Sequence, residues 1–248
     1  MMWRVIRLET RNAYSNMAVD NAIMDGQRSM TSPPTIRFYK WMPSAVSIGC
    51  FQSMDDEVNV EKCKELGVSC VRRITGGGAV YHDTDGEITY SVIAPESGFP
   101  KNIIESYRLI CSWVVSGLST LGINAEFAPI NDIIVSGKKI SGNAQARRNG
   151  VLLQHGTVLY SADVGKMFSV LKVSQEKISD KAIKSAEERV TSVADHSDAT
   201  QEGLHDALLK GFVEGKEYEF GSLSLDEAEK AGELEKRVYS SNSWNFSR

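Results

Sequence analysis

Two arginines followed by three glycines form the part of the sequence best suited to bind an anion. Residues 72–83 are RRITGGGAVYHD, and an expected strand at residues 68–73 leads into them. Because glycine has no Cβ, a ligand can lie directly on the backbone at residues 76–78. Consecutive N–H groups in such a turn bind anions, and Arg73 adds a planar fork of donors for phosphate or carboxylate. A β-turn with surface arginines is the structural alternative, but glycines weaken a sheet unless something approaches closely there.

A lysine pair lies in a second cluster, GKKISGNAQ at residues 137–145. Consecutive side chains of a strand point to opposite faces, so only one of Lys138 and Lys139 can face the glycine turn. Gly142 and Ala144 are small residues against which a ligand could pack. Together the two clusters predict a site for a phosphorylated or carboxylated ligand.

Asn131, Asp132 and two histidines are the remaining candidate polar groups. The Asp132 carboxylate is a candidate ligand for Mg²⁺, although Asn-Asp is also common in turns. His82 and His155 are candidates for catalysis, but a hydrogen-bonded structural histidine is the more common case, and neither has a serine or cysteine nucleophile beside it in sequence. The glycine pattern matches neither a dinucleotide-binding fingerprint nor a Walker loop.

The elements that must position these groups alternate between helices and strands, which predicts an α+β fold with a mixed sheet. Strands are expected at residues 3–8, 35–40, 45–51, 68–73, 87–93, 132–135, 138–140, 151–160 and 218–220. Helices are expected at residues 15–30, 55–66, 102–121, 164–171, 201–213 and 226–238. The helix at 102–121 has the most continuous apolar stripe, and Ser15 is the expected N-cap of the first helix.

Composition excludes several classes of function. The 248 residues carry a net charge of −4, which argues against a nucleic-acid-binding protein. The sequence contains no apolar run long enough to span a membrane and no signal-peptide pattern at its start. The four cysteines show neither a CxxC pair nor zinc-ligand spacing. These features predict a cytoplasmic protein with reduced, mostly buried thiols that binds neither nucleic acid nor membrane.

Three motifs together resemble the lipoate–protein ligase A family, which belongs to the wider biotin/lipoyl ligase and octanoyltransferase superfamily. They are RRITGGGAVYHD, NDIIVSGKKISGNAQARR and LLQHGTVLY. The resemblance extends to RFYKWMPSAVSIGCFQ and to the segment YSSNSWNF near the end, so it covers nearly the whole chain. It implies a catalytic domain like those of biotin ligases and class II aminoacyl-tRNA synthetases, with one such domain over residues 1–248.

The resemblance also implies a two-step reaction. Lipoate and MgATP form lipoyl-AMP, and the lipoyl group then passes to a lysine of a lipoyl-domain protein, such as an E2 subunit of a 2-oxoacid dehydrogenase or the glycine cleavage H protein. Lys139 is the implied catalytic residue, because it could bridge the carboxylate and the α-phosphate. Asp132 is the implied Mg²⁺ ligand, and Val46, Ile48 and Val80 are candidates for the acyl slot. The implied binding residues are Arg73, Thr75, Gly76, Gly77, Gly78, Ala79, Val80, Tyr81, Asn131, Lys139, Gly142, Ala144 and His155.

Two rival functions stay open at this point. The family's two-domain members continue into a small accessory domain, which this sequence lacks, so either a separate subunit supplies it or the chain works without it. Relatives of similar length are octanoyltransferases, which use a cysteine thioester and no ATP. Residues 124–145 and 151–175 contain no cysteine, which favours the ligase. A non-catalytic lipoyl- or nucleotide-binding regulator is the other alternative, although such a protein would not need Lys139.

Overall fold

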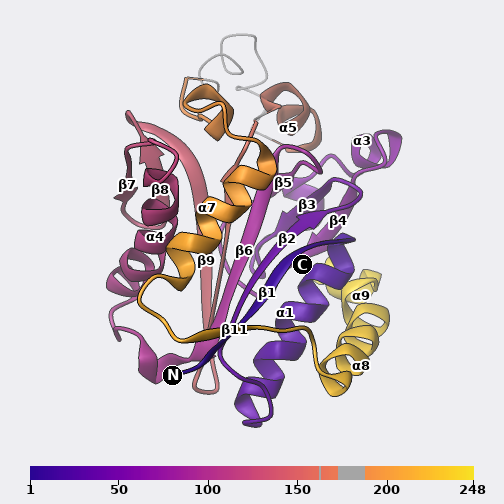
Figure 1. Ribbon diagram of the computed structural model, residues 1–248. Helices are drawn as coiled ribbons and strands as arrows, with labels where there is room; N and C mark the ends of the chain where they lie inside the picture. The colour runs from indigo at the N-terminus through magenta and orange to yellow at the C-terminus, as the bar shows by residue number, and fades with distance from the viewer. Residues whose placement is uncertain (162, 173–187) are drawn as a thin grey trace.

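A mixed eight-stranded sheet forms the centre of the computed structural model, which describes residues 1–161, 163–172 and 188–248 (Figure 1). The strand order is β11-β1-β2-β6-β10-β9-β8-β7. The strands β11, β1 and β2 pair in parallel, and the remaining pairs are antiparallel. The bounds are β1 Trp3–Arg11, β2 Thr35–Trp41, β6 Glu87–Pro95, β7 Ala125–Ala128, β8 Asp132–Val135, β9 Lys138–Arg148, β10 Val151–Leu159 and β11 Tyr218–Phe220. The predicted α+β fold is confirmed.

A second, three-stranded sheet carries the glycine turn. Its order is β4-β3-β5, with bounds β3 Ala45–Ile48, β4 Ser69–Arg72 and β5 Val80–His82. Because β4 and β5 lie on opposite sides of β3, the chain between them must cross the end of β3. Residues 73–79 make that crossing, which fixes the glycine turn above the carboxyl end of β3.

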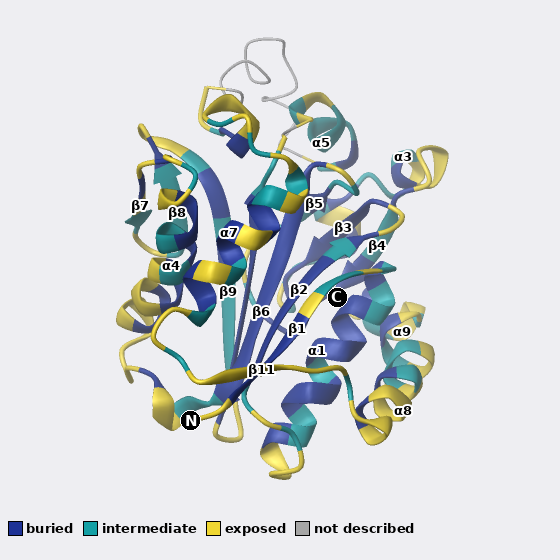
Figure 2. Cartoon of the chain, in the orientation of Figure 1, coloured by how far each residue is buried: buried dark blue, intermediate teal, exposed yellow. Residues whose placement is uncertain are grey.

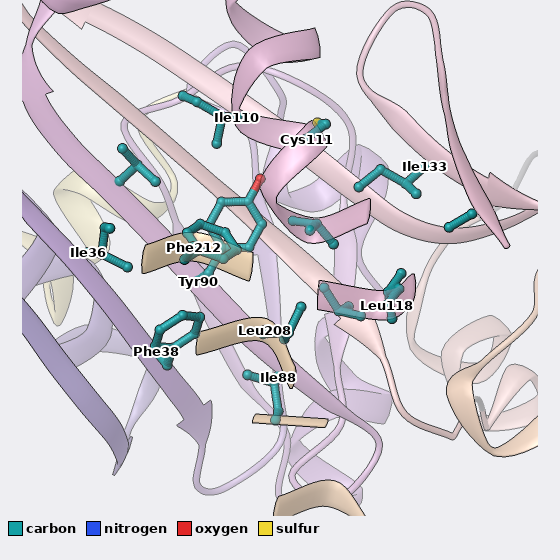
Figure 3. Close-up of a cluster of buried hydrophobic side chains, with 14 of the residues drawn as sticks. Ile36, Phe38, Ile88, Tyr90, Ile110, Cys111, Leu118, Ile133, Leu208 and Phe212 are labelled. Atoms are coloured by element: carbon teal, nitrogen blue, oxygen red, sulfur yellow. The ribbon is translucent and has the colours of Figure 1, made fainter. Parts of the chain in front are cut away.

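Helices cover both faces of the large sheet. On one face, α4 (Ile103–Ser119) and α7 (Gln201–Val213) pack over the apolar cluster shown in Figure 3, where Phe38, Tyr90 and Phe212 meet. On the other face lie α1 (Ala13–Arg28), α8 (Leu225–Leu234) and the π-helical turn η4 (Glu235–Tyr239). Figure 2 shows the expected pattern: the central strands are buried, and the exposed residues lie on the outer helices, on loops and on β11.

Short helices complete the described fold. They are α2 (Met54–Glu57), α3 (Val60–Glu65), α5 (Val164–Val170), α9 (Asn242–Asn245) and the 3₁₀ turns η1 (Glu96–Gly98) and η3 (Val193–Asp195). Within the described part of the chain, no helix is long and apolar enough to cross a membrane.

Several sequence expectations need correction. The helix expected at residues 55–66 is two helices, because the Asn59 side chain caps a new start by accepting from the Lys62 N–H at 3.1 Å. Asn12, rather than Ser15, caps α1, and its side chain accepts from the Ser15 N–H at 2.8 Å. The strand expected at 138–140 runs on to Arg148, and the short strands β5 and β7 were not expected. The remaining expected elements are present within a few residues of their predicted ends.

Candidate active site

A cavity of about 170 Å³ lies between the glycine turn and the β8–β9 hairpin. Most of the residues that the sequence singled out line it: Arg73, Gly77, Gly78, Ala79, Val80, Asn131, Lys139, Gly142, Ala144 and His155. Thr75, Gly76 and Asp132 do not line it but contact residues that do. Tyr81 faces away, because its ring packs into the small apolar cluster under the second sheet and its hydroxyl donates to Asp83 at 3.0 Å.

A β-bulge decides which lysine faces the cavity. Across β8 and β9, Asp132 pairs with Gly142 and Ile133 with Ser141, but Ile134 then pairs with Lys139. The extra residue, Ile140, turns into the core, and Lys139 comes to the same face as Gly142 and Asp132. Lys138 is exposed, as expected for the other member of the pair.

Lys139 is held next to the cavity by a weak contact. Its Nζ lies 2.7 Å from Asp132 Oδ1, and the two side chains are 43% and 33% exposed. Exposed ion pairs contribute only about 0.2–1 kcal/mol, so an anionic ligand can replace the carboxylate. Gly142 makes room for the amine, because a Cβ there would lie 2.8 Å from Lys139 Nζ. The lysine is therefore reachable and free to move onto a ligand.

Arg73, unlike Lys139, is buried and held by many hydrogen bonds. Its Nε donates to Thr75 Oγ1 at 3.1 Å, Nη1 to the Ser47 carbonyl and hydroxyl at 3.0 and 3.2 Å, and Nη2 to the carbonyls of Gly76 and Gly78 at 2.7 and 2.8 Å. Burial lowers the pKa of Arg73 to about 10. Arginine has five N–H donors and all are used here, which corrects the expectation that the Arg73 fork is free for a phosphate or carboxylate. Arg73 instead holds the turn in shape.

The backbone of the turn supplies the open donors. Gly77 and Gly78 are exposed, and within the described residues the N–H groups of residues 76–79 donate to no protein acceptor. Gly77 has a φ of +94°, which a residue with a side chain rarely adopts. Unpaired backbone N–H groups in a turn that lines the same cavity as a lysine can bind an anion.

His155 lines the cavity, but its ring nitrogens connect the turn to the core. Its Nε2 lies 2.7 Å from Thr75 Oγ1, and its Nδ1 lies 3.5 Å from Asp20 Oδ2. Thr75 Oγ1 also accepts from Arg73 Nε, so this hydroxyl joins the histidine to the arginine. Burial lowers the pKa of His155, and the nearby Asp20 carboxylate opposes this shift.

His82 also has a structural role. Its Nδ1 lies 2.7 Å from Glu87 Oε1, its Nε2 lies 2.8 Å from Ser47 Oγ, and Trp41 stacks on the ring at 3.9 Å between centroids. Both ring nitrogens of each histidine are directed at protein groups. The hydrogen-bonded structural role is therefore the one that the geometry gives to His82 and to His155.

Three of the apolar side chains that line the cavity come from residues that the sequence did not single out as site residues. Met17 of α1 and Tyr39 and Trp41 of β2 line it together with Val80. Trp41 lies inside the quoted segment RFYKWMPSAVSIGCFQ, and this was the feature of the sequence that could have identified it as a site residue. The expectation for Val46 and Ile48 is wrong, because both are fully buried in the cluster under the second sheet. An anion-binding mouth and an aromatic interior suit a carboxylate on an apolar tail.

None of the four cysteines, all of which lie in described residues, lines the cavity. Cys111 points from α4 into the core beside Ile110 and Tyr90, where burial raises its pKa to about 12 (Figure 3). Cys63 is buried, while Cys50 and Cys70 are half-buried, so the expectation of mostly buried thiols holds for only two of them. A thiol nucleophile needs both access and a lowered pKa at the reacting centre.

The site offers little to a metal ion by itself. Among the described residues, no group of three His, Cys, Asp or Glu side chains is arranged to hold one. Asp132 is the one metal ligand that the sequence analysis predicted, and its Oδ1 is 2.7 Å from Lys139 Nζ. Mg²⁺ often takes one carboxylate plus substrate phosphates, so the site suits an ion that arrives with a nucleotide.

Comparisons with known proteins agree with this geometry. A family described as the lipoyl protein ligase A/B catalytic domain matches residues 12–213. This chain belongs to that family. An octanoyltransferase LipM of Kyrpidia tusciae is 37% identical, over 98% of each chain. The resemblance stated from the three motifs is thus confirmed.

Solved structures are similar over nearly the same length. One is the bi-partite lipoate protein ligase of Thermoplasma acidophilum, with a TM-score of 0.88, 35% identity and coverage of 99% of this chain and 96% of that one. Another is a lipoate-protein ligase A bound with ATP, with a TM-score of 0.85, 32% identity and 99% coverage of each chain. The chain is therefore a lipoyl- or octanoyl-transfer enzyme of this family, rather than a regulator.

Proposed function

We propose that this chain is an ATP-dependent lipoate–protein ligase, which forms lipoyl-AMP and passes the lipoyl group to a lysine of an acceptor domain. The observation that carries the proposal is the absence of any cysteine among the described residues that line the cavity, where Lys139 instead faces the open N–H groups of the glycine turn. Activation through a phosphate anhydride needs those cationic and N–H donors. Activation through a thioester needs a thiol at the same place.

In the first step, a carboxylate oxygen attacks the α-phosphorus of ATP, an O–P bond forms and pyrophosphate leaves. Two anions must approach each other, so the step is slow without nearby positive charge. Lys139 Nζ leaves Asp132 and donates between the carboxylate and the α-phosphate, while the N–H groups of residues 76–79 bind phosphate or carboxyl oxygens. Mg²⁺, when bound, would neutralise the β- and γ-phosphates, with Asp132 as its protein ligand. The apolar tail lies against Tyr39 and Trp41.

In the second step, the amine of the acceptor lysine attacks the acyl carbonyl, an amide forms and AMP leaves. The acceptors would be lipoyl-domain proteins such as E2 subunits and the glycine cleavage H protein. The Thermoplasma acidophilum ligase, described as bi-partite and studied with its E2 lipoyl domain, supports such an acceptor. It also supports a separate accessory subunit that works with the catalytic domain of residues 1–248. We place the reaction in the cytoplasm.

Octanoyl transfer from acyl carrier protein is the second candidate. Curated relatives at 32–37% identity bear the name octanoyltransferase LipM, and these names favour the transferase over the ligase that the sequence motifs ranked first. The solved ligases at 32–35% identity and the thiol-free cavity favour the ligase. The two candidates share the acyl slot and the acceptor, and they differ only in how the acyl group is activated.

One assay with two donor arms separates them. The protein is incubated with a lipoyl domain and either lipoate plus MgATP or octanoyl-acyl carrier protein, with and without an accessory chain. Lipoate-dependent pyrophosphate release and a mass gain on the acceptor support the ligase. Transfer from octanoyl-acyl carrier protein that is lost on Cys50→Ser or Cys70→Ser contradicts it and supports the transferase.

A further inference from the structure

The segment Ser241–Phe246, called here the C-terminal hook, completes the edge of the small sheet. In the order β4-β3-β5, β4 is an outer strand, and its Arg72 has both backbone groups directed outward. Asn245 Oδ1 accepts from the Arg72 N–H at 2.8 Å, and Trp244 Nε1 donates to the Arg72 carbonyl at 2.8 Å. Two side chains thus take the place of a neighbouring strand. A buried backbone N–H and carbonyl at a sheet edge would cost folding free energy if they had no hydrogen-bond partners.

The Arg72 side chain links the hook to a loop that lies next to the active site. It is 1% exposed and does not line the cavity, although its position beside Arg73 suggested an anion ligand. Its Nε donates to the Trp244 carbonyl at 2.9 Å and its Nη2 to the Asn245 carbonyl at 3.0 Å. Its Nη1 donates to the carbonyls of Gly49 and Gln52 at 3.3 and 2.5 Å. One guanidinium therefore joins the hook to the loop at residues 49–52.

That loop lies directly under the glycine turn. The Cys50 N–H donates to the Thr75 carbonyl at 2.9 Å. A Cβ on Gly49 would overlap the Gly77 carbonyl oxygen, so the two backbones are in contact. The Gly49 N–H is held by Gln52 Oε1 at 3.0 Å. The path from the hook to the open N–H groups therefore runs through Arg72 and residues 49–52 without a gap.

We propose that Asn245 and Trp244 are positioning residues for the glycine turn, acting through Arg72. Asn245 is 4% exposed, and its Nδ2 donates to the Tyr239 carbonyl at 2.7 Å, which ties the hook to η4. Removing the Asn245 amide frees one side of the loop at 49–52. The backbone N–H groups of the turn then remain, but they are no longer held in fixed positions. The kinetic part of this inference depends on the proposed ligase activity, whereas its structural part does not.

The test compares Asn245→Ala with Asn242→Ala, an exposed asparagine in the same short helix. We expect Asn245→Ala to raise the KM for ATP about tenfold with kcat within twofold, because a misplaced site weakens ligand positioning. Amide hydrogen exchange of Cys50 and Arg73, whose N–H groups are bonded to Thr75 and Ile48, should accelerate at least tenfold. The peptide covering residues 138–143 should exchange as in the wild type.

Trp244→Phe, which removes the indole donor together with part of the ring system, should show the same effects at a smaller size. If Asn245→Ala matches Asn242→Ala in exchange, or if residues 138–143 accelerate equally, the hook has no special link to the turn and the inference is wrong. Should the wild type release no pyrophosphate, the proposed ligase function fails, and the exchange comparison alone still decides the role of the hook.

Discussion

The two halves of the site are built in opposite ways. The glycine turn is held in place by Arg73, which is 4% exposed and donates all five of its side-chain N–H groups to protein acceptors. The turn therefore offers a ligand its backbone N–H groups rather than the guanidinium of Arg73. The lysine hairpin is adaptable: the Lys139 side chain is 43% exposed and has one carboxylate partner. The residue type alone suggested that both cations bind the ligand. In the structure, Arg73 holds the glycine turn in shape, and Lys139 is the side chain that can move to contact the ligand.

This difference has a physical reason. A site that stabilises developing charge works best when its donors are already oriented before the reaction. Backbone N–H groups held by a buried arginine meet that need. The Lys139 amine must move with the reacting oxygens, so it cannot be fixed in the same way. Its ion pair with Asp132 is partly exposed and therefore costs little free energy to break.

The largest expected effect comes from removing the arginine. Arg73→Ala should lower the free energy of unfolding by about 3–5 kcal/mol, because it leaves several buried carbonyls and hydroxyls without donors. Urea denaturation followed by circular dichroism measures this. Arg108→Ala, on an exposed face of α4, should change it by about 0.5 kcal/mol or less. Equal stabilities of the two variants would contradict the structural role of Arg73.

A smaller effect is expected when the lysine is displaced without being removed. A Cβ at Gly142 would lie 2.8 Å from both Cε and Nζ of Lys139, so Gly142→Ala should push the amine aside. Misplacement of a reacting group by 1 Å can cost roughly 100-fold, so we expect up to that loss in lipoyl-AMP formation. The double variant with Lys139→Ala should be no slower than Lys139→Ala alone. A further loss in the double variant would show that Gly142 acts independently of the lysine.

These two regions also show how far the sequence could lead. The motifs predicted that Lys139, Gly77 and Gly78 lie in one site, and all three line the cavity. The bulge at Ile140 depends on strand pairing with β8, which no local pattern reveals. The partners of Arg73 include Ser47, which reaches it only because β4 lies beside β3.

Residues distant in sequence explain the other omissions. The apolar interior needs Met17 and Trp41, whose positions follow from packing of α1 and β2 around the cavity. Asn12 and Ser15 are both good N-caps, so propensity could not choose between them.

The smallest expected effect is a dependence of stability on pH. Burial lowers the pKa of His155 below the 6.5 of the unfolded chain, so the unfolded state binds more protons between those two values. Stability should therefore fall as pH drops below 6.5, by at most about 1.4 kcal/mol per pH unit for one proton. His155→Gln keeps a polar group near Thr75 but cannot titrate, so it should remove this contribution. Urea midpoints between pH 7.5 and 5 test it, and an unchanged slope in the variant would exclude His155 as the source.

The most direct test of the account is lipoate-dependent exchange of pyrophosphate into ATP, measured for Lys139→Ala and Lys138→Ala side by side. The two lysines are neighbours of the same charge, and the bulge directs only Lys139 to the cavity. We predict that Lys139→Ala loses about 100- to 1,000-fold in exchange rate, as for the loss of one preorganised donor, while Lys138→Ala stays near the wild type. Equal exchange in both variants would contradict it.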